Sequence, residues 1–293
     1  MSTPAVLAPS ASLADFLELT KPRITTLVVL TALVGFVMAS QTAIVAAPLV
    51  FALVGTGLVA AGASALNMVL ERDTDARMLR TRNRPLAAGR MRPAEAVGFG
   101  LGLTTLGLAV LYWLSGPLSA AVAFLTWFTY LFCYTPLKRR TSLSTLVGAV
   151  PGALPPVIGW AAARGAVDGG AFVLFAILFL WQVPHFLAIA WIYRDDYMRG
   201  GLPMLPVVDA EGRLTGRQTV VHAFALLLVS LVPTGAAMAG RAYLVGALLL
   251  GAGFLAFSLR LALLRTLAAA RSLFLASVVY LTCLCALLIA DRI

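Results

Sequence analysis

The segment NMVLERDTDARMLRTRNRP, residues 67–85, follows directly on a long apolar stretch and contains three acids and five arginines. Asn67, Glu71 and Asp75 are spaced i, i+4 and i+8, so on a helix their side chains lie along one face. Oxygen ligands in this arrangement suit Mg²⁺, which commonly couples one or two carboxylates to a substrate phosphate. Arg80 and Arg84 follow closely and are suited to binding the phosphate itself. The segment therefore predicts a metal and phosphate site at the end of an apolar helix.

The rest of the chain is predominantly apolar. Of its 293 residues 61% are hydrophobic and the mean hydropathy is +0.95, which excludes a soluble globular protein. Apolar stretches long enough to cross a lipid bilayer predict an all-α membrane bundle of nine spans, in one domain that covers residues 1–293. The predicted spans are 24–42, 44–66, 95–114, 118–135, 144–163, 171–192, 219–239, 242–264 and 271–290.

The distribution of charge predicts the orientation of the bundle. Three charged loops, 67–94, 136–143 and 193–218, fall on one side of the membrane, and of the 22 basic residues only Arg164, Arg241 and Arg292 fall on the other. The positive-inside rule then places the N-terminus in the cytoplasm and the C-terminus outside. The net charge of +10 belongs to these loops, so no nucleic-acid partner is expected.

The first 20 residues carry two acids but no lysine or arginine, which fits neither a signal peptide nor a transit peptide. We expect them to form a flexible cytoplasmic N-terminus. Arginine far outnumbers lysine and alanine is abundant, which favours a bacterial chain. We expect the protein to lie in the inner membrane of the cell.

A second acidic cluster, Asp195 and Asp196, lies in the third charged loop. Two acidic clusters on one side of the membrane could hold a diphosphate between them through Mg²⁺, with Asp196 as a further metal ligand and Asp195 near the substrate. An ordinary pair of acids beside the membrane is the alternative interpretation.

His185 follows Pro184 inside a predicted span, and a polar ring at that depth is often functional. It could bind a substrate, or it could hydrogen-bond a backbone carbonyl that Pro184 frees. The basic residues Lys21, Arg23, Lys138 and Arg139 leave a similar choice, because they could close over anionic substrate groups or only set the topology.

The stretch 148–160 holds three glycines and three prolines within one predicted span. We expect it to be bent or partly unwound, which membranes tolerate only where the backbone faces protein or a cavity. It is interpreted as a pocket wall.

Together these motifs resemble the UbiA superfamily of intramembrane prenyltransferases, whose first motif combines spaced Asn and Asp residues with Arg-Thr-x-x-Arg-Pro. Asn67, Asp75, Arg80, Thr81, Arg84 and Pro85 match it, whereas Met68 and Glu71 stand where the motif has aspartates. The segments LTKPR at 19–23, YTPLKR at 134–139 and WQVPHF at 181–186 are similar to the branch that forms heme O.

The resemblance implies a helical bundle with a central cavity, farnesyl diphosphate and heme b as substrates, Mg²⁺ as cofactor, and heme O and diphosphate as products. Heme O would pass to a terminal oxidase or to the heme A synthase that acts next. Arg80, Arg84 and either Lys138 or Arg139 would stabilise the leaving diphosphate. Trp160, Trp181 and Phe186 could face the allylic cation.

Two other functions fit parts of the pattern. A related prenyltransferase could act on a quinone precursor or a chlorophyllide. A transporter would also have broken helices and charged residues in the membrane, but it predicts charges near mid-span, whereas the acids here lie at span ends.

Overall fold

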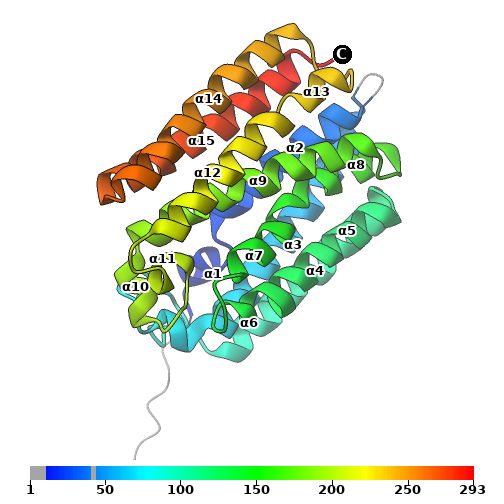
Figure 1. Cartoon of the computed structure of the whole chain (residues 1–293). Helices are drawn as coiled ribbons and strands as arrows, with labels where there is room; N and C mark the ends of the chain where they lie inside the picture. The colour runs from blue at the N-terminus through cyan, green and yellow to red at the C-terminus, as the bar shows by residue number, and fades with distance from the viewer. Residues whose placement is uncertain (1–10, 41–43) are drawn as a thin grey trace, which may run out of the picture.

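A computed structural model describes residues 11–40 and 44–293, and these residues fold into a bundle of helices (Figure 1). The prediction of nine spans is confirmed: nine helical segments of this part of the chain are long and apolar enough to cross a membrane. Outside the helices only an isolated bridge pairs Ala239 with Arg292, and no longer strand occurs among the described residues. The spans are α2 (Pro22–Ala39), α3 (Ala46–Asp75), α4 (Pro93–Leu114), α5 (Pro117–Phe128) with η1 (Thr129–Tyr134) and α6 (Thr135–Leu137), α7 (Ser144–Ala153) with α8 (Pro155–Arg164), α9 (Gly169–Ile192), α12 (Arg213–Val229) with α13 (Val232–Gly235), α14 (Arg241–Leu264) and α15 (Leu267–Ala290).

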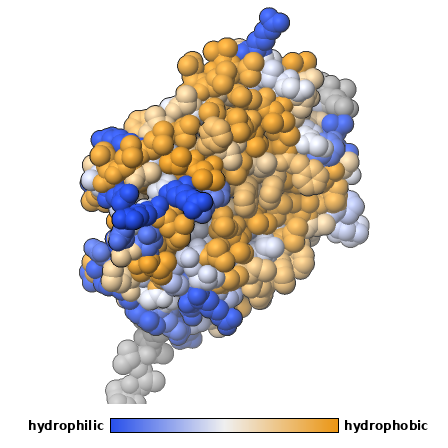
Figure 2. All heavy atoms as spheres, viewed as in Figure 1, coloured by the Kyte–Doolittle hydropathy of each residue, from blue (hydrophilic) through white to orange (hydrophobic). Residues whose placement is uncertain are grey.

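Short helices cover one end of the bundle. They are α1 (Leu13–Leu19), α10 (Arg194–Arg199) and α11 (Leu205–Val208), and α6 lies at the same end (Figure 1). On the face shown in Figure 2, hydrophilic residues gather mainly at this end, whereas the middle of the molecule is broadly apolar. The chain is therefore a multi-pass membrane protein with a polar cap, and its C-terminus lies at the other end of the bundle.

Two predicted boundaries differ from the structure. Helix α3 continues to Asp75, so the first nine residues of the predicted loop 67–94 are helical. This extension contains no proline or glycine, and its two buried acids, Glu71 and Asp75, are paired with cations from outside the helix. The seventh span begins at Arg213, where the sequence predicted a loop to residue 218.

The prediction of a flexible N-terminus is wrong for α1, and residues 1–10 lie outside the described residues. Ser12 and Asp15 cap α1 reciprocally, which satisfies two backbone N–H groups at its start. Arg90 then joins α1 to the loop after α3, since its guanidinium lies 2.8 Å from Asp15 and 3.1 Å from Glu18.

Glycines allow α3 and α4 to pack with their backbones in contact. A Cβ atom at Gly62 of α3 would lie 2.6 Å from the carbonyl oxygen of Gly100 in α4. Seven residues away along each helix, a Cβ at Gly107 would lie 2.7 Å from the carbonyl oxygen of Gly55. Small residues at such contacts let the backbones of membrane helices approach closely. This contact fixes α3, which carries the predicted metal site.

The prediction that residues 148–160 form a bent or broken helix is confirmed. The span divides at Leu154 into α7 and α8, with Pro151 inside α7 and Pro155 opening α8. Gly159 packs on the carbonyl oxygen of Ala32 in α2, closer than any Cβ atom could approach. The broken backbone is thus buried against protein, as the bilayer requires.

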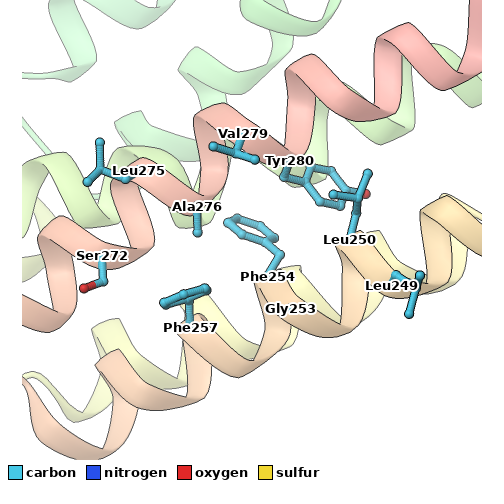
Figure 3. Close-up of a pocket in the computed structure, with 10 residues that line it drawn as sticks. All are labelled: Leu249, Leu250, Gly253, Phe254, Phe257, Ser272, Leu275, Ala276, Val279 and Tyr280. Atoms are coloured by element: carbon cyan, nitrogen blue, oxygen red, sulfur yellow. The ribbon is translucent and has the colours of Figure 1, made fainter.

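A groove of about 450 Å³ runs between α14 and α15 on the outside of the bundle (Figure 3). Leu249, Leu275 and Val279 on its rim are exposed, and the hydroxyl of Ser272 is one of its few polar groups. The groove therefore opens toward lipid.

The α3–α4 contact predicts a sharp difference between two glycines. Gly62→Ala should lower the free energy of unfolding by about 1–3 kcal/mol, the usual cost of overpacking, because the two helices must separate. Gly102→Ala, on the open face of α4 where a Cβ meets nothing within 4 Å, should be neutral or stabilising. Thermal unfolding of the purified variants in one detergent measures both effects. Equal melting temperatures for the two variants would contradict the proposed contact.

Candidate active site

Three polar side chains lie buried along one face at the end of α3. Asn67, Glu71 and Asp75 are 1%, 6% and 1% exposed, although they lie at the polar end of a membrane helix. The predicted i, i+4, i+8 alignment is therefore real, and the helix continues far enough to include all three residues. Two buried carboxylates need compensating positive charge.

Cations from three separate elements supply that charge. Lys21, which precedes α2, donates to Asn67 Oδ1 at 2.8 Å. Lys138, which follows α6, lies 2.7 Å from Glu71 Oε1, and Arg84 lies 2.7 Å from Asp75 Oδ2. The structure thus brings together six of the predicted site residues in one network.

One carboxylate oxygen of this network has no partner. Asp75 Oδ1 is buried and accepts no hydrogen bond from the described part of the chain. A buried carboxylate oxygen without a hydrogen-bond partner fits a hard cation such as Mg²⁺. Within the described residues no three His, Cys, Asp or Glu side chains converge on one point. Any ion held by Asp75 and Glu71 would therefore draw its remaining ligands from Asn67, the substrate or water.

The two lysines differ in their electrostatic surroundings. Burial, together with the nearby Arg84, lowers the pKa of Lys21 to about 7. Burial also acts against the charged form of Lys138, but the Glu71 carboxylate together with Tyr134 and Tyr197 outweighs it, so the pKa of Lys138 is raised well above its usual value. Lys21 also adopts a left-handed backbone conformation, with φ of 46°, before Pro22. A non-glycine residue in that region is strained, so the fold holds Lys21 in place.

Asp196 of the second acidic cluster holds the loop that follows α3. Its Oδ1 accepts from the backbone N–H of Leu79 at 2.8 Å and from Arg199 at 2.6 Å, and its Oδ2 accepts from the N–H of Arg80 at 3.1 Å. Burial acts in the opposite direction, but these donors lower the pKa of Asp196. Both of its carboxylate oxygens accept hydrogen bonds, so Asp196 links the two loops and has no oxygen left without a partner for a metal ion.

The other predicted residues occupy the rim of the site. Thr81 donates to the Asp75 carbonyl at 3.0 Å and so fixes the loop. The Arg80 guanidinium lies 4.9 Å from the centre of the Tyr193 ring, and Arg139 donates to the Leu70 carbonyl at 2.7 Å. Arg23 and Asp195 are exposed. These two do not contact the network.

Three residues near the acids were missed in the sequence. Thr135 accepts from Asn67 Nδ2 at 3.1 Å, and the Lys138 ammonium lies 5.2 Å from the centre of the Tyr134 ring. Tyr130 and Tyr134 stack with centroids 5.7 Å apart, both within the π-helix η1. π-Helical turns are frequent at functional sites, but no local pattern marks them in a sequence. The available signals were the i, i+4 spacing of the tyrosines and the segment YTPLKR at 134–139, which contains Tyr134 and Thr135.

Trp160 does not lie near the network, so the role suggested for its ring is wrong. It packs on Gly170 at the start of α9 and lies 5.8 Å from Arg164 at the end of α8. Asp196 and its loop follow the other end of α9. A helix of this length separates the two ends by roughly 30 Å.

His185 also makes a contact that the sequence did not predict. Its Nδ1 lies 2.7 Å from the hydroxyl of Ser277 in α15, and its ring stacks on Trp181 with centroids 4.7 Å apart. Neither ring nitrogen bonds a backbone carbonyl of the described residues, so the alternative based on Pro184 is wrong.

Comparison with known proteins identifies the family. The profile described as the UbiA prenyltransferase family matches residues 28–284. A protein named protoheme IX farnesyltransferase, from Solibacter usitatus (strain Ellin6076), is 48% identical over 95% of this chain and 98% of its own. A solved structure of a digeranylgeranylglyceryl phosphate synthase is similar with a TM-score of 0.80 at 15% identity, over 95% of this chain and 98% of its own. A UbiA homolog from Archaeoglobus fulgidus bound to DMAPP and Mg²⁺ gives 0.67 at 15% identity, over 94% and 99%. By its sequence and its fold, this chain belongs to the UbiA prenyltransferase family.

Proposed function

We propose that this protein transfers the farnesyl group of farnesyl diphosphate to a vinyl group of heme b, with addition of water, to give heme O and diphosphate. The main structural support for this reaction is the buried network that Glu71 and Asp75 form with Lys21, Arg84 and Lys138. The choice of substrates rests on the relative named protoheme IX farnesyltransferase, which aligns with this chain over nearly its whole length.

Asn67, Glu71 and Asp75 are the residues that would hold Mg²⁺. The fit rests on their oxygen donors and on Asp75 Oδ1, which is buried without a partner. The structurally similar protein from Archaeoglobus fulgidus, which binds DMAPP and Mg²⁺, supports this choice of metal. When bound, Mg²⁺ supplies positive charge that makes the diphosphate a better leaving group.

The cations of the network would change partners when substrate binds. Arg84 and Lys138 now pair with the two acids and Lys21 donates to the Asn67 amide oxygen, and each of the three would turn to oxygens of the diphosphate. Arg80, Arg139 and Arg23 would add positive charge at the rim of the site. Thr81 and Asp196 would hold the loop that carries Arg80 and Arg84.

The chemistry then follows from charge and exclusion of water. The bond between the farnesyl carbon and the diphosphate oxygen breaks, and its electron pair leaves with the diphosphate, which the cations stabilise. The rings of Tyr130 and Tyr134 lie next to Lys138 and could face the allylic cation. The vinyl group of heme b donates its π electrons to that cation. Water captures the new cation beside the porphyrin and loses a proton, which leaves a hydroxyethylfarnesyl group.

The setting of the reaction is part of the proposal. The chain would act as one domain in the inner membrane of a bacterium, with the polar cap and N-terminus in the cytoplasm and the C-terminus outside. The farnesylated product is more apolar than heme b, so its acceptor should also be a membrane protein, either heme A synthase or a terminal oxidase.

Incubation of the purified enzyme with Mg²⁺ and labelled farnesyl diphosphate tests the proposal. Heme b should become a labelled, more apolar heme that chromatography separates, whereas 4-hydroxybenzoate should remain unlabelled. Labelled 4-hydroxybenzoate with unchanged heme b would instead identify a quinone-pathway prenyltransferase.

Asp75→Asn should lower kcat by about 10²–10³, because it removes a charge that acts on the reacting diphosphate while keeping the side chain's shape. Asp73→Asn is the matched control, since Asp73 is exposed and paired only with Arg72. Initial rates of heme O formation, at equal amounts of folded protein, measure both variants. If Asp75→Asn kept more than about a tenth of the wild-type kcat, the proposed metal site would be wrong.

Arg84→Lys keeps the charge but loses the planar guanidinium, so it should raise the KM for farnesyl diphosphate by roughly tenfold or more. Arg82→Lys makes the same change two residues earlier, at an exposed side chain outside the network, and should leave the KM nearly unchanged. Steady-state kinetics with varied farnesyl diphosphate measure the difference. Similar increases in both variants would show that general loop charge, and not a specific site, governs binding.

A further inference from the structure

The ring of His185 is fixed on several sides by neighbouring side chains. Trp181 stacks on it at 4.7 Å with an interplanar angle of 23°, and the Phe274 and Phe186 rings lie at 5.2 Å and 5.8 Å. Trp181 is itself fixed, because its Nε1 donates to the Ser277 carbonyl at 2.8 Å. A histidine whose ring cannot rotate presents its nitrogens in a defined direction, which an unused core histidine does not need.

The hydrogen bonds around Ser277 determine which nitrogen of His185 carries a proton. The Ser277 hydroxyl lies 2.5 Å from the carbonyl oxygen of Phe274, and a carbonyl can only accept. The single hydroxyl proton is therefore used there, and Ser277 Oγ must accept from His185 Nδ1. In the neutral ring the lone pair then lies on Nε2.

His185 Nε2 remains available to a ligand. It makes no hydrogen bond within residues 11–40 and 44–293, and the protein does not fully enclose it. The ring is only partly buried, so this nitrogen is accessible. An accessible lone pair on an oriented imidazole is the arrangement that proteins use to bind metal ions, heme iron included.

The position of His185 along α9 connects it with the candidate active site. Helix α9 ends at Ile192, and Asp196 just beyond it holds the loop after α3. His185 lies about 10 Å inside that end, at about 1.5 Å per residue. In heme b the vinyl groups lie at the edge of the porphyrin and the iron at its centre. A ligand for the iron is therefore expected deeper in the membrane than the diphosphate site.

We propose that His185 Nε2 is an axial ligand of the heme iron and that Ser277 is the residue that positions it. This inference rests on the proposed function, because it takes heme b as the substrate. Coordination would fix the porphyrin in the site, so that its edge meets the farnesyl cation. Ser277 acts through His185: it fixes the tautomer and the plane of the ring but does not touch the heme.

Two variants and two controls test the proposal. Heme b is titrated into the purified protein in lipid nanodiscs, and the absorption and electron paramagnetic resonance spectra report the iron ligands. His185→Ala should lose the spectrum of histidine-ligated heme, and added imidazole should restore it. His222→Ala is the matched control, since His222 is the only other histidine and bonds a carbonyl of its own helix, that of Gln218.

Ser277→Ala should retain histidine ligation but weaken heme affinity by about 10- to 100-fold, the usual effect of losing a partner of a metal-bound histidine. Ser258→Ala is its control, because Ser258 is equally buried and bonds only the Phe254 carbonyl. Affinity for farnesyl diphosphate, measured separately, should stay within about twofold of wild type in all four variants, since none of the residues contacts the acidic network.

The possible results separate this inference from the proposed function. A wild-type protein that forms heme O, with a heme spectrum unchanged in His185→Ala, would overturn the ligand role and leave the function standing. Loss of the spectrum in His222→Ala instead would also overturn it. A wild-type protein that neither binds heme b nor converts it would contradict the proposed function itself.

Discussion

The placement of two carboxylates inside the end of a membrane helix is the constraint on which the site depends. Glu71 and Asp75 are almost fully buried, and an unpaired charge there would be strongly destabilising. Each carboxylate is neutralised by a cation that the chain supplies from another element. Three segments are thereby tied to α3: the turn before α2, the loop after α3, and the end of α6.

In the proposed mechanism the same charges would serve both stability and chemistry. Without substrate, the lysines and Arg84 compensate the acids. A diphosphate with its metal ion brings both signs of charge, so the acids and the cations can each find a new partner without leaving a buried charge unpaired. A site that is stable both empty and occupied needs such an exchange, since these groups are buried and an unpaired charge there would be costly.

Two irregular stretches of backbone lie beside the network. Lys21 has a left-handed conformation, which costs a non-glycine residue about 1–3 kcal/mol, and the π-helix η1 places Tyr130 and Tyr134 beside Lys138. The close packing of α3 on α4 and of α2 on α8 holds these features in place, because glycines let the backbones touch. The rigid bundle thus stabilises local geometry that the segments would not adopt by themselves.

The sequence by itself determined the nine spans, the all-α class, the break near residue 154 and the alignment of Asn67, Glu71 and Asp75. Each of these depends on local properties: length, apolar content, proline and glycine positions, and the helical period. Only the tertiary structure decided which groups face the acids and which hold His185. Lys21 meets Asn67 across 46 residues, Lys138 meets Glu71 across 67, and Ser277 meets His185 across 92. Those pairings follow from how the helices pack, and packing depends on the fit of whole surfaces that no short segment contains. For the same reason Asp196, which the sequence predicted as a metal ligand, instead holds the loop after α3. The backbone N–H groups that donate to it belong to Arg80 and Leu79, 116 and 117 residues away.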